Sequence, residues 1–402
     1  MKLIHTADWH IGQSFFGYDR REEHSFFFDW LKETIKEQQV DVLLVAGDVF
    51  DSPNPSAESQ RQYYKFLKEV SVANPQLQVV ITAGNHDSAA RLEAPNPLLE
   101  EMNVRVRGVV KKDKEGNVDA KQLFIPLLEK GKTKAWCVAV PYLRQGDYPL
   151  AETYAQGVKA LYDTLYAELQ KEKEPGEPVV VMGHLHALGA EVSENDRSER
   201  VVVGGLECVS SQTFDQEDIV YTALGHLHKA QKVAGRETVR YSGSPLPMSF
   251  AEKNYKQGVN LVEIIGKEAK VERLPFQPLA GLISLPKEPK LLPEVLDEIR
   301  LLPDGGVRAD SPYLELKVLV TEPEPSMRSR IEEALEGKAV RLTSALSFRM
   351  KTEAELKTIS YEELKAVSPA ELAENVFLNR YGKAMPEKMK SLLYQVIEEV
   401  MK

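Results

Sequence analysis

The chain has 402 residues, more than one ordinary hydrophobic core accommodates, so two or three domains are expected. Its 51 Lys and Arg stand against 61 Asp and Glu, and a net charge of −10 argues against bulk attraction to nucleic acid. No apolar run approaches the length of a membrane span, and the N-terminus lacks a secretory pattern. With only Cys137 and Cys208 there is no disulfide framework, so a cytoplasmic location is expected.

Residues 1–272 alternate apolar, β-branched runs with amphipathic segments, which is the pattern of an α/β domain. The first helix is expected around Phe27, Leu31 and Ile35, which recur at four-residue spacing. Further helices are expected over 57–71, after Asp87-Ser88 and over 159–173, with a surface hairpin turn within 111–121.

Clustered prolines from 275 to 293 mark a linker and then a small α+β unit over 278–352. Its expected elements are a strand at 282–285, a helix at 293–302, a strand at 313–320, a helix at 326–336 and a strand at 339–350. The segment 360–402 carries two amphipathic helices, and their apolar stripes need a cover. That cover is either their own domain or a partner protein.

Five apolar runs stop at a group of metal-ligand residues, and six of the eight histidines fall in these groups. The groups are Asp8 and His10; Asp48 and Asp51; Asn85, His86 and Asp87; His184 and His186; and His226 and His228. Strands that each end in Asp, Asn or His describe one crevice at the carboxyl ends of a sheet.

Histidine and aspartate with one asparagine, and no thiolate, favour Mn²⁺, Fe or Zn²⁺ over Ca²⁺ or Mg²⁺. Seven plausible ligands are too many for one tetrahedral ion and suit two octahedral ions that share a carboxylate. Asp48 follows the strand VLLVA after a single residue, Gly47, so it is the carboxylate expected to bridge the two ions. Paired ions of this kind activate a water molecule and clamp a phosphoryl group.

The motifs Asp-x-His at 8–10, Gly-Asp-x-x-Asp at 47–51, Gly-Asn-His-Asp at 84–87, Gly-His at 183–184 and Gly-His-x-His at 225–228 resemble the calcineurin-like metallophosphoesterase superfamily. The blocks HTADWHIG at 5–12, AGNHDS at 83–88, ALGHLHKAQ at 223–231 and YSGSP at 241–245 resemble the SbcD family of nuclease subunits within it. The resemblance implies a β-sandwich flanked by helices, a small α+β capping domain that contacts DNA, and C-terminal partner-binding helices.

Carried onto this chain, the resemblance assigns one ion to Asp8, His10, Asp48 and His228 and the other to Asp48, Asn85, His184 and His226. It gives His86 the role of proton donor and Asp51 that of the carboxylate that orients His86. It implies two divalent ions, expected to be Mn²⁺, and an SbcC-like coiled-coil ATPase as partner of a homodimer within a heterotetramer. The implied activity is ATP-dependent double-strand exonuclease and single-strand or hairpin endonuclease in DNA repair, recombination and replication.

Several alternatives remain at this point. His186 is interpreted as a supporting or substrate-loop residue, and Asp87 as a helix cap in preference to a catalyst. Phe15 and Phe16 are candidates to contact a nucleotide base, although at least one is expected in the core. The alternative function is another metallophosphoesterase, acting on small nucleotides or phosphoproteins. Phosphoprotein phosphatases typically read Asp-Arg-Gly where this chain has Asp51-Ser52-Pro53, which counts against them.

Overall fold

The computed structural model describes residues 1–191, 208–320 and 324–349, together with positions 377, 385, 386, 389, 390, 392 and 393. The chain divides into two compact units, residues 1–318 with 325–346, and residues 319–324 with 347–402. The two helices expected within 360–402 lie outside the described residues, apart from those isolated positions.

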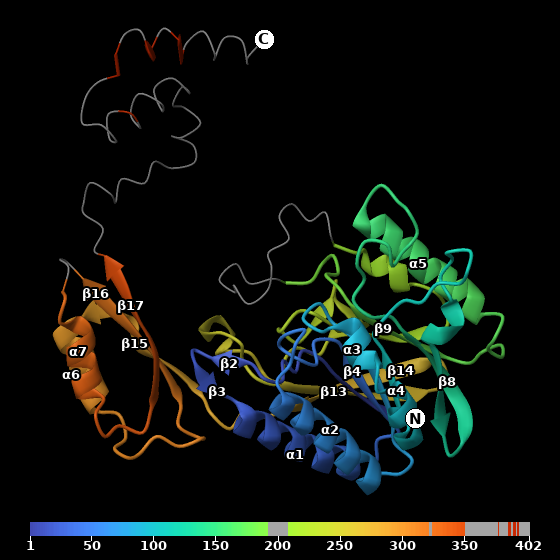
Figure 1. Cartoon of the computed structure of the whole chain (residues 1–402), viewed down its shortest axis with the longest axis horizontal. Helices are drawn as coiled ribbons and strands as arrows, with labels where there is room; N and C mark the ends of the chain where they lie inside the picture. Colours follow the sequence, from blue (N-terminus) through green and yellow to red (C-terminus); the bar gives the residue numbers. More distant parts are fainter. Residues whose placement is uncertain are drawn as a thin grey trace. The chain divides into compact units, whose positions relative to one another are not determined.

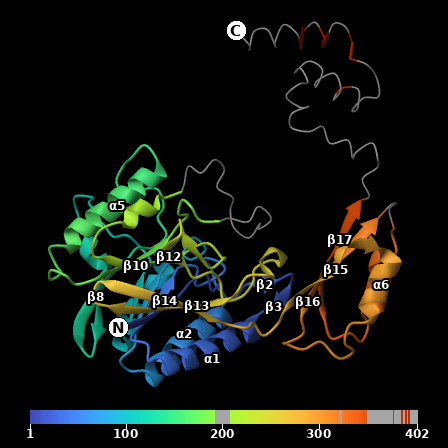
Figure 2. The same cartoon turned by 180° about the vertical axis from the view of Figure 1, so that it is seen from behind.

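Two six-stranded mixed sheets form the centre of the first unit (Figures 1 and 2). The first has the order β14-β13-β1-β4-β5-β6, with bounds Glu268–Pro275, Gly258–Ile265, Lys2–Thr6, Val42–Ala46, Gln78–Thr82 and Val104–Arg107. The second has the order β11-β12-β10-β9-β8-β7, with bounds Gln231–Val233, Arg236–Tyr241, Ile219–Gly225, Val179–His184, Lys132–Ala139 and Phe124–Glu129. In each sheet four adjacent strands run parallel, β1-β4-β5-β6 in the first and β8-β9-β10-β12 in the second.

The sheets stack face to face because their strands are apolar on both faces. Leu44 of β4 and Val180 of β9 belong to the core between the sheets. The residues next to them point to the outer faces of the sheets. Leu43 packs in the core between the first sheet and its helices, and Val181 packs in the core between the second sheet and its helix. The result is a helix-sheet-sheet-helix sandwich, and the predicted α/β class is confirmed.

Helices α1 (Arg21–Gln38) and α2 (Ala57–Ala73) cover the outer face of the first sheet, and α5 (Tyr154–Leu169) covers the second (Figure 1). Two short helices, α3 (Ala89–Glu93) and α4 (Asn96–Leu99), follow β5. The predicted helices before residue 100 are confirmed. The fourth begins about five residues before the predicted start, because Thr153 and Gln156 form a capping box that the apolar spacing does not reveal.

A three-stranded sheet of order β15-β16-β17 follows, with bounds Leu282–Leu291, Tyr313–Val320 and Arg341–Arg349. Helices α6 (Leu292–Arg300) and α7 (Met327–Ala334) alternate with its strands, as the sequence predicts. The first strand is longer than predicted because it is an edge strand, where Pro286 and Pro289 are tolerated. Among the described residues the remaining pair is the hairpin of β2 (Ser14–Phe15) and β3 (Tyr18–Asp19).

Candidate metal centre

The predicted site residues converge at the carboxyl ends of strands from both sheets. Strands β1, β4 and β5 of the first sheet lead into Asp8 and His10, Asp48, and Asn85 and His86. Strands β9 and β10 of the second sheet end at His184 and lead into His226 and His228. Because all five strands are parallel within their sheets, these side chains meet at one end of the sandwich.

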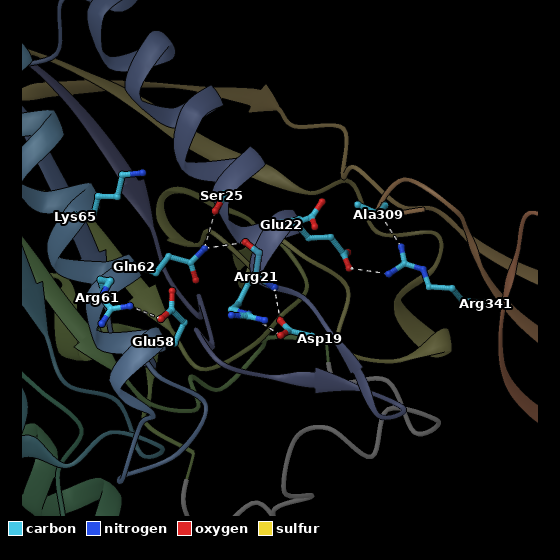
Figure 3. Close-up of a pocket in the computed structure, with 11 residues that line it drawn as sticks. Asp19, Arg21, Glu22, Ser25, Glu58, Arg61, Gln62, Lys65, Ala309 and Arg341 are labelled. Atoms are coloured by element: carbon cyan, nitrogen blue, oxygen red, sulfur yellow. Dashed lines mark hydrogen bonds and ion pairs between the residues drawn. The ribbon is translucent and has the colours of Figure 1, made fainter. Parts of the chain in front are cut away.

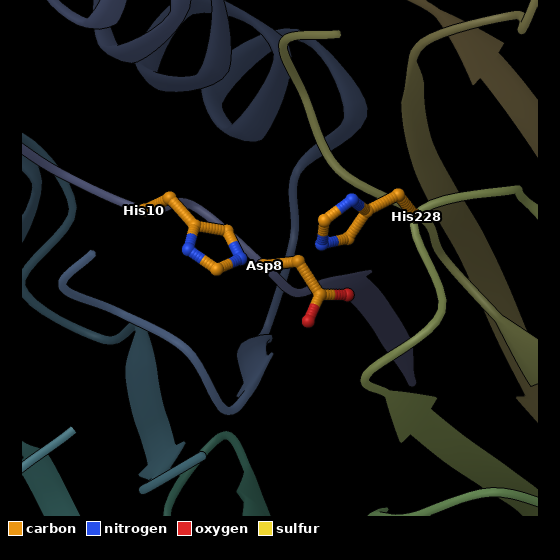
Figure 4. Close-up of side chains that lie close together, drawn as sticks. All are labelled: Asp8, His10 and His228. Carbon is orange, nitrogen blue, oxygen red and sulfur yellow. The ribbon is translucent and has the colours of Figure 1, made fainter. Parts of the chain in front are cut away.

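Three groups of possible ligands have their donor atoms within 4.8 Å of one another, and none of these residues is exposed. The first group is Asp8, His10 and His228 (Figure 4), the second is Asp48, His184 and His226, and the third is His10, Asp48 and His86. The amide oxygen of Asn85 joins the second group, 3.0 Å from His184 Nε2 and 2.9 Å from His226 Nδ1. Asp48 and His10 belong to two groups each, so the groups adjoin.

Glycines before two of these clusters let the segments approach closely. A Cβ atom at Gly84 would lie 2.1 Å from Asp48 Oδ1, and one at Gly225 would lie 1.8 Å from the carbonyl oxygen of Ala46. No side chain fits at either position without moving the backbone. The glycines that end these apolar runs therefore create room for the cluster.

Two of the histidines have a hydrogen bond at Nδ1 that directs Nε2 into the site, and a third has its Nδ1 beside a carboxylate. His184 Nδ1 donates to the carbonyl of Ala46 at 2.9 Å, and His228 Nδ1 lies 3.0 Å from Glu252 Oε1. His10 Nδ1 lies 3.3 Å from Asp51 Oδ1. Metal-binding histidines are commonly oriented in this way.

Glu252 follows the sequence block at 241–245, but the sequence assigned it no role; the structure places it beside the candidate ligand His228. Its carboxylate is fully buried, and its second oxygen accepts the backbone N–H of Met248 at 2.9 Å. It lies 24 residues beyond His228 in a short turn of helix, Phe250–Glu252. No periodicity or spacing in the sequence connects the two, although Glu252 follows one of the recognised sequence blocks.

The structure corrects the expected contact between Asp51 and His86. His86 Nδ1 lies 2.9 Å from the backbone carbonyl of Asp51, whereas the Asp51 carboxylate faces His10. The Asp51 side chain is turned toward the segment that carries His10, and only the main chain of Asp51 reaches His86. The carboxylate of Asp51 therefore supports His10 and does not orient His86.

Asp87 is not a helix cap, contrary to expectation. The N-cap position of α3 is Ser88, which makes no side-chain capping bond. The Asp87 carboxylate instead accepts the backbone N–H groups of Gly84 at 2.8 Å, Phe50 at 2.9 Å and Val49 at 3.1 Å. It thus fastens the segment after β5 to the segment after β4.

Burial and mutual charge shift the titration of the central groups. Burial, reinforced by the charge of Asp48, raises the pKa of Asp8 to about 7, although His184 and His228 oppose the shift. Burial favours neutral His184, but the carboxylates of Asp48 and Asp8 outweigh it and raise the pKa of His184 to about 9. Burial would raise the pKa of Asp48, yet His184 and its other histidine neighbours hold it well below the usual range. Two buried carboxylates therefore require nearby positive charge.

The donor set fits metal ions. Asp8 Oδ2 and His10 Nε2 are buried and have no hydrogen-bond partner within the described part of the chain. Buried polar atoms of this kind normally have a partner, and both residues belong to the first group. Nitrogen and oxygen donors in two adjoining groups suit a pair of divalent ions.

The other histidines do not join these groups. His186 packs edge-on against His226, with ring centroids 4.2 Å apart, and burial lowers its pKa to about 4. His24 is buried in α1, and its Nε2 lies 2.8 Å from the carbonyl of Trp9, so it supports the segment that carries the first ligands. His5 is buried beside Tyr221, with 2.8 Å between Nδ1 and the phenol oxygen.

Two more site residues follow β8, the neighbour of β9. The ring centroid of Tyr142 lies 6.1 Å from that of His184 and 6.4 Å from that of His226. The exposed guanidinium of Arg144 lies 5.5 Å from the Tyr142 ring centroid. The apolar run of β8 ends in Pro141 and Tyr142 and not in a metal-ligand type, so the sequence search passed over it.

Comparison with known proteins agrees with this architecture. Residues 1–230 match the calcineurin-like phosphoesterase family, and residues 275–381 match the family described as type 5 capsule protein repressor C-terminal domain. The chain is 38% identical to the SbcD subunit of the SbcCD nuclease of Rhodobacter capsulatus over 88% of both chains. It is 34% identical to the SbcD of Escherichia coli K12 over 70% of both, and 30% identical to that of Bacillus subtilis over 65% of this chain and 66% of the relative.

The chain belongs to the calcineurin-like phosphoesterases, which are metal-dependent hydrolases. Within that class it belongs to the SbcD family of nuclease subunits, as the sequence blocks indicated. No helix in the described residues combines the length and apolarity that crossing a membrane requires.

Proposed function

We propose that the chain is the nuclease subunit of an SbcCD-type complex and hydrolyses DNA phosphodiester bonds with two Mn²⁺ ions. The observation that carries the proposal is the adjoining arrangement of the groups Asp8/His10/His228 and Asp48/His184/His226, with Asn85 beside the second. Its relatives, the SbcD subunits of SbcCD nucleases, support DNA as the substrate and an SbcC-like ATPase as the partner.

The proposed ligands of the first ion are Asp8, His10, Asp48 and His228, and those of the second are Asp48, Asn85, His184 and His226. A bound pair of divalent ions supplies an acidified water and neutralises the phosphoryl oxygens. Backbone groups orient the carboxylates, because His226 N–H donates to Asp8 Oδ1 at 2.9 Å and His86 N–H donates to Asp48 Oδ1 at 2.8 Å.

His86 is proposed to protonate the leaving oxygen. Its Nδ1 is occupied by the carbonyl of Asp51, so Nε2 is the atom that can deliver a proton. Its ring lies beside that of His10, with centroids 4.8 Å apart, and it belongs to the group formed with His10 and Asp48. The side chain is therefore at the ligand cluster without being needed as a ligand.

The hairpin of β2 and β3 is proposed to contact the nucleic acid. Phe15 is buried, but Phe16 is 53% exposed and has a left-handed backbone with φ 51°. An exposed ring held in a strained turn a few residues after His10 is a suitable stacking surface for a base. This arrangement fulfils the expectation that at least one of the two rings packs in the core.

The remaining features are carried over as proposals. They are a DNA-contacting capping domain over 278–352, a partner-binding segment over 360–402, a homodimer within a heterotetramer and a cytoplasmic location. The family resemblance supports the first three, and a chain with two cysteines suits a reducing compartment.

The test is direct. The purified chain with Mn²⁺ is incubated with end-labelled single- and double-stranded DNA, bis-p-nitrophenyl phosphate and a phosphopeptide. Cleavage of DNA and of the model diester is expected, and Asp48→Asn should abolish both because it weakens both ion sites. Dephosphorylation of the peptide without DNA cleavage would contradict the proposal. Co-expression with an SbcC-like ATPase and co-purification tests the partner.

A further inference from the structure

A cavity of about 370 Å³ lies where the edges of the two sheets meet, outside the metal centre. It is lined by residues from β11, β12, β13 and β14 and from the segment before β13. Five of its lining side chains are cationic and none is a carboxylate: Lys229, Lys232, Arg240, Lys256 and Arg273. A chain with a net charge of −10 does not produce such a concentration by composition alone.

Carboxylates around the cavity compensate only part of this charge. Lys229 pairs with Glu191, while Lys232 and Arg240 share Glu237. Lys256 and Arg273 have no carboxylate partner in residues 1–191, 208–320 or 324–349. The cavity therefore keeps an excess of positive charge that an anion can neutralise.

The guanidinium of Arg273 is held in place before any ligand arrives. It donates to Asn260 Oδ1 at 3.2 Å and to the carbonyl of Lys256 at 3.1 Å. Its Nε is buried and has no partner among the described residues, and burial together with the charge of Arg240 lowers the pKa of Arg273 to about 10. A fixed guanidinium with spare donors suits the oxygens of a phosphate.

The cavity adjoins the catalytic centre along the chain. Lys229 directly follows His228, and the backbone N–H of Ser244 donates to the carbonyl of His228 at 3.1 Å. We propose that this basic cavity binds a backbone phosphate of the nucleic-acid substrate at a distance from the phosphate that is cleaved. The inference rests on the proposed nuclease function and adds a second contact site for the same substrate.

Nucleic acid fits the lining better than an acidic protein does. Protein interfaces depend on apolar and aromatic anchors, and here only Ala230 and Tyr255 are of that kind. The remaining lining residues are the amides Gln231, Asn254 and Asn260. The side-chain N–H groups of Gln231 and Asn260 already donate within the chain, so the exposed Asn254 is the amide that can bond to a phosphate or sugar oxygen.

A larger cavity has a different character (Figure 3). It measures about 560 Å³ beside α1 and α2, and its four acidic lining side chains balance its four basic ones. Arg21 bonds to Asp19 at 2.6 Å, and Arg61 bonds to Glu58 at 2.7 Å. It therefore lacks the excess charge that supports anion binding at the sheet edges.

The test compares the double variant Lys232→Gln/Lys256→Gln with the parent chain. Both lysines are exposed, so the fold should persist, and thermal unfolding checks this. Lys112→Gln/Lys114→Gln, in an exposed hairpin, changes the net charge equally and serves as the control. DNA affinity is measured against salt concentration over a series of duplex lengths. Hydrolysis of bis-p-nitrophenyl phosphate reports separately on the metal centre.

Each phosphate contact contributes roughly 0.9 to the slope of log affinity against log salt. Between about 50 and 200 mM salt, the fold decrease in DNA affinity should therefore be about tenfold smaller for the double variant than for the parent chain. The effect should appear only with duplexes long enough to reach the cavity, while the control pair and model-diester hydrolysis stay at the parent level.

A salt slope equal to that of the parent, or a change matched by the control pair, would overturn the inference. Lost binding of a co-expressed protein with unchanged DNA binding would also overturn it, in favour of a protein-binding surface. If the parent itself neither binds nor cleaves DNA, the proposed function fails instead, so the two failures are distinguishable.

Discussion

Glu252 offers a sharp test of how the first ion site is supported. Both of its oxygens are acceptors: one faces His228 Nδ1 at 3.0 Å and the other accepts the N–H of Met248 at 2.9 Å. Glutamine has the same shape but only one acceptor oxygen, so Glu252→Gln places an NH₂ group against one of these donors. The change should therefore lose one hydrogen bond to a buried charged group.

The magnitude follows from that loss. A hydrogen bond to a charged group contributes about 1.5–3 kcal/mol, and removing a partner of a metal-binding histidine typically lowers metal affinity about 10–100-fold. The two figures agree, because tenfold corresponds to about 1.4 kcal/mol. The loss should fall on the ion bound by Asp8, His10 and His228 and spare the ion bound beside Asn85.

Calorimetric titration with Mn²⁺ resolves the two sites. Glu93→Gln is the control, because both Glu93 oxygens also have partners away from the candidate ligands: Oε2 accepts the backbone N–H groups of Gly108 at 2.9 Å and Val109 at 3.0 Å, and Oε1 pairs with Lys111 at 2.8 Å. Both variants should lower the melting temperature, but only Glu252→Gln should lower metal affinity. Binding of both ions with parental affinity by Glu252→Gln would refute the supporting role.

Four further predictions follow from the site. His86→Ala should retain both ions and DNA affinity while cleavage slows roughly 10²–10⁴-fold, measured by metal analysis and single-turnover kinetics. Asp51→Asn should act mainly through His10 and raise the Mn²⁺ concentration needed for half-maximal rate. At saturating Mn²⁺ it should slow cleavage less than His86→Ala does, and an equal loss of rate would contradict the contacts of Asp51. In the metal-free site the pKa is about 9 for His184 and about 7 for Asp8, so at pH 7 both groups carry protons that a metal ion must displace. Metal binding at pH 7 should therefore release protons, and metal affinity should rise as the pH increases toward 9. Calorimetric titration in buffers of different ionisation enthalpy counts the released protons, and zero release would contradict this prediction. Arg144 is exposed beside Tyr142 and is expected to contact a substrate phosphate. Arg144→Ala should therefore reduce the salt slope of DNA binding by roughly one phosphate contact and leave bis-p-nitrophenyl phosphate hydrolysis intact, whereas Arg144→Lys should restore most of the slope.

The convergence of the candidate ligands was predictable because two simple rules coincide at the strand ends. An apolar run bounded by glycine predicts a buried strand, and the carboxyl ends of parallel strands meet at one edge. Asp48, which follows β4 through Gly47, is placed by these rules alone. The same rules overlook Tyr142, because its strand ends in a residue that is not a metal ligand.

The supporting contacts were not predictable because spacing does not decide which atoms meet. Asp51 lies within reach of both His10 and His86, and only the folded backbone shows that its carboxylate turns to the first and its carbonyl to the second. The sequence allows Asp87 to cap a helix, but in the fold its carboxylate accepts three buried backbone N–H groups instead. Glu252 is adjacent to His228 only through the fold.

The backbone at the candidate metal centre shows what fixes the candidate ligands. Asp8, His10 and Asp48 have φ values of 54°, 47° and 48°, and His226 has 103°, a region that side-chain-bearing residues rarely adopt. Each such conformation costs roughly 1–3 kcal/mol and persists only where the surroundings impose it.

Main-chain bonds between the first two ligand segments impose this conformation on Asp8, His10 and Asp48. Asp8 N–H donates to the carbonyl of Gly47 at 3.1 Å, His10 N–H to that of Asp48 at 3.0 Å and Ile11 N–H to that of Val49 at 2.9 Å. These bonds extend the pairing of β1 with β4 beyond the strand ends, where the two segments bend together. The three strained residues are thus held by main-chain bonds to the neighbouring segment. Because the buried core on both sides of β4 anchors that pairing, the fold itself sets the positions of the candidate ligands Asp8, His10 and Asp48.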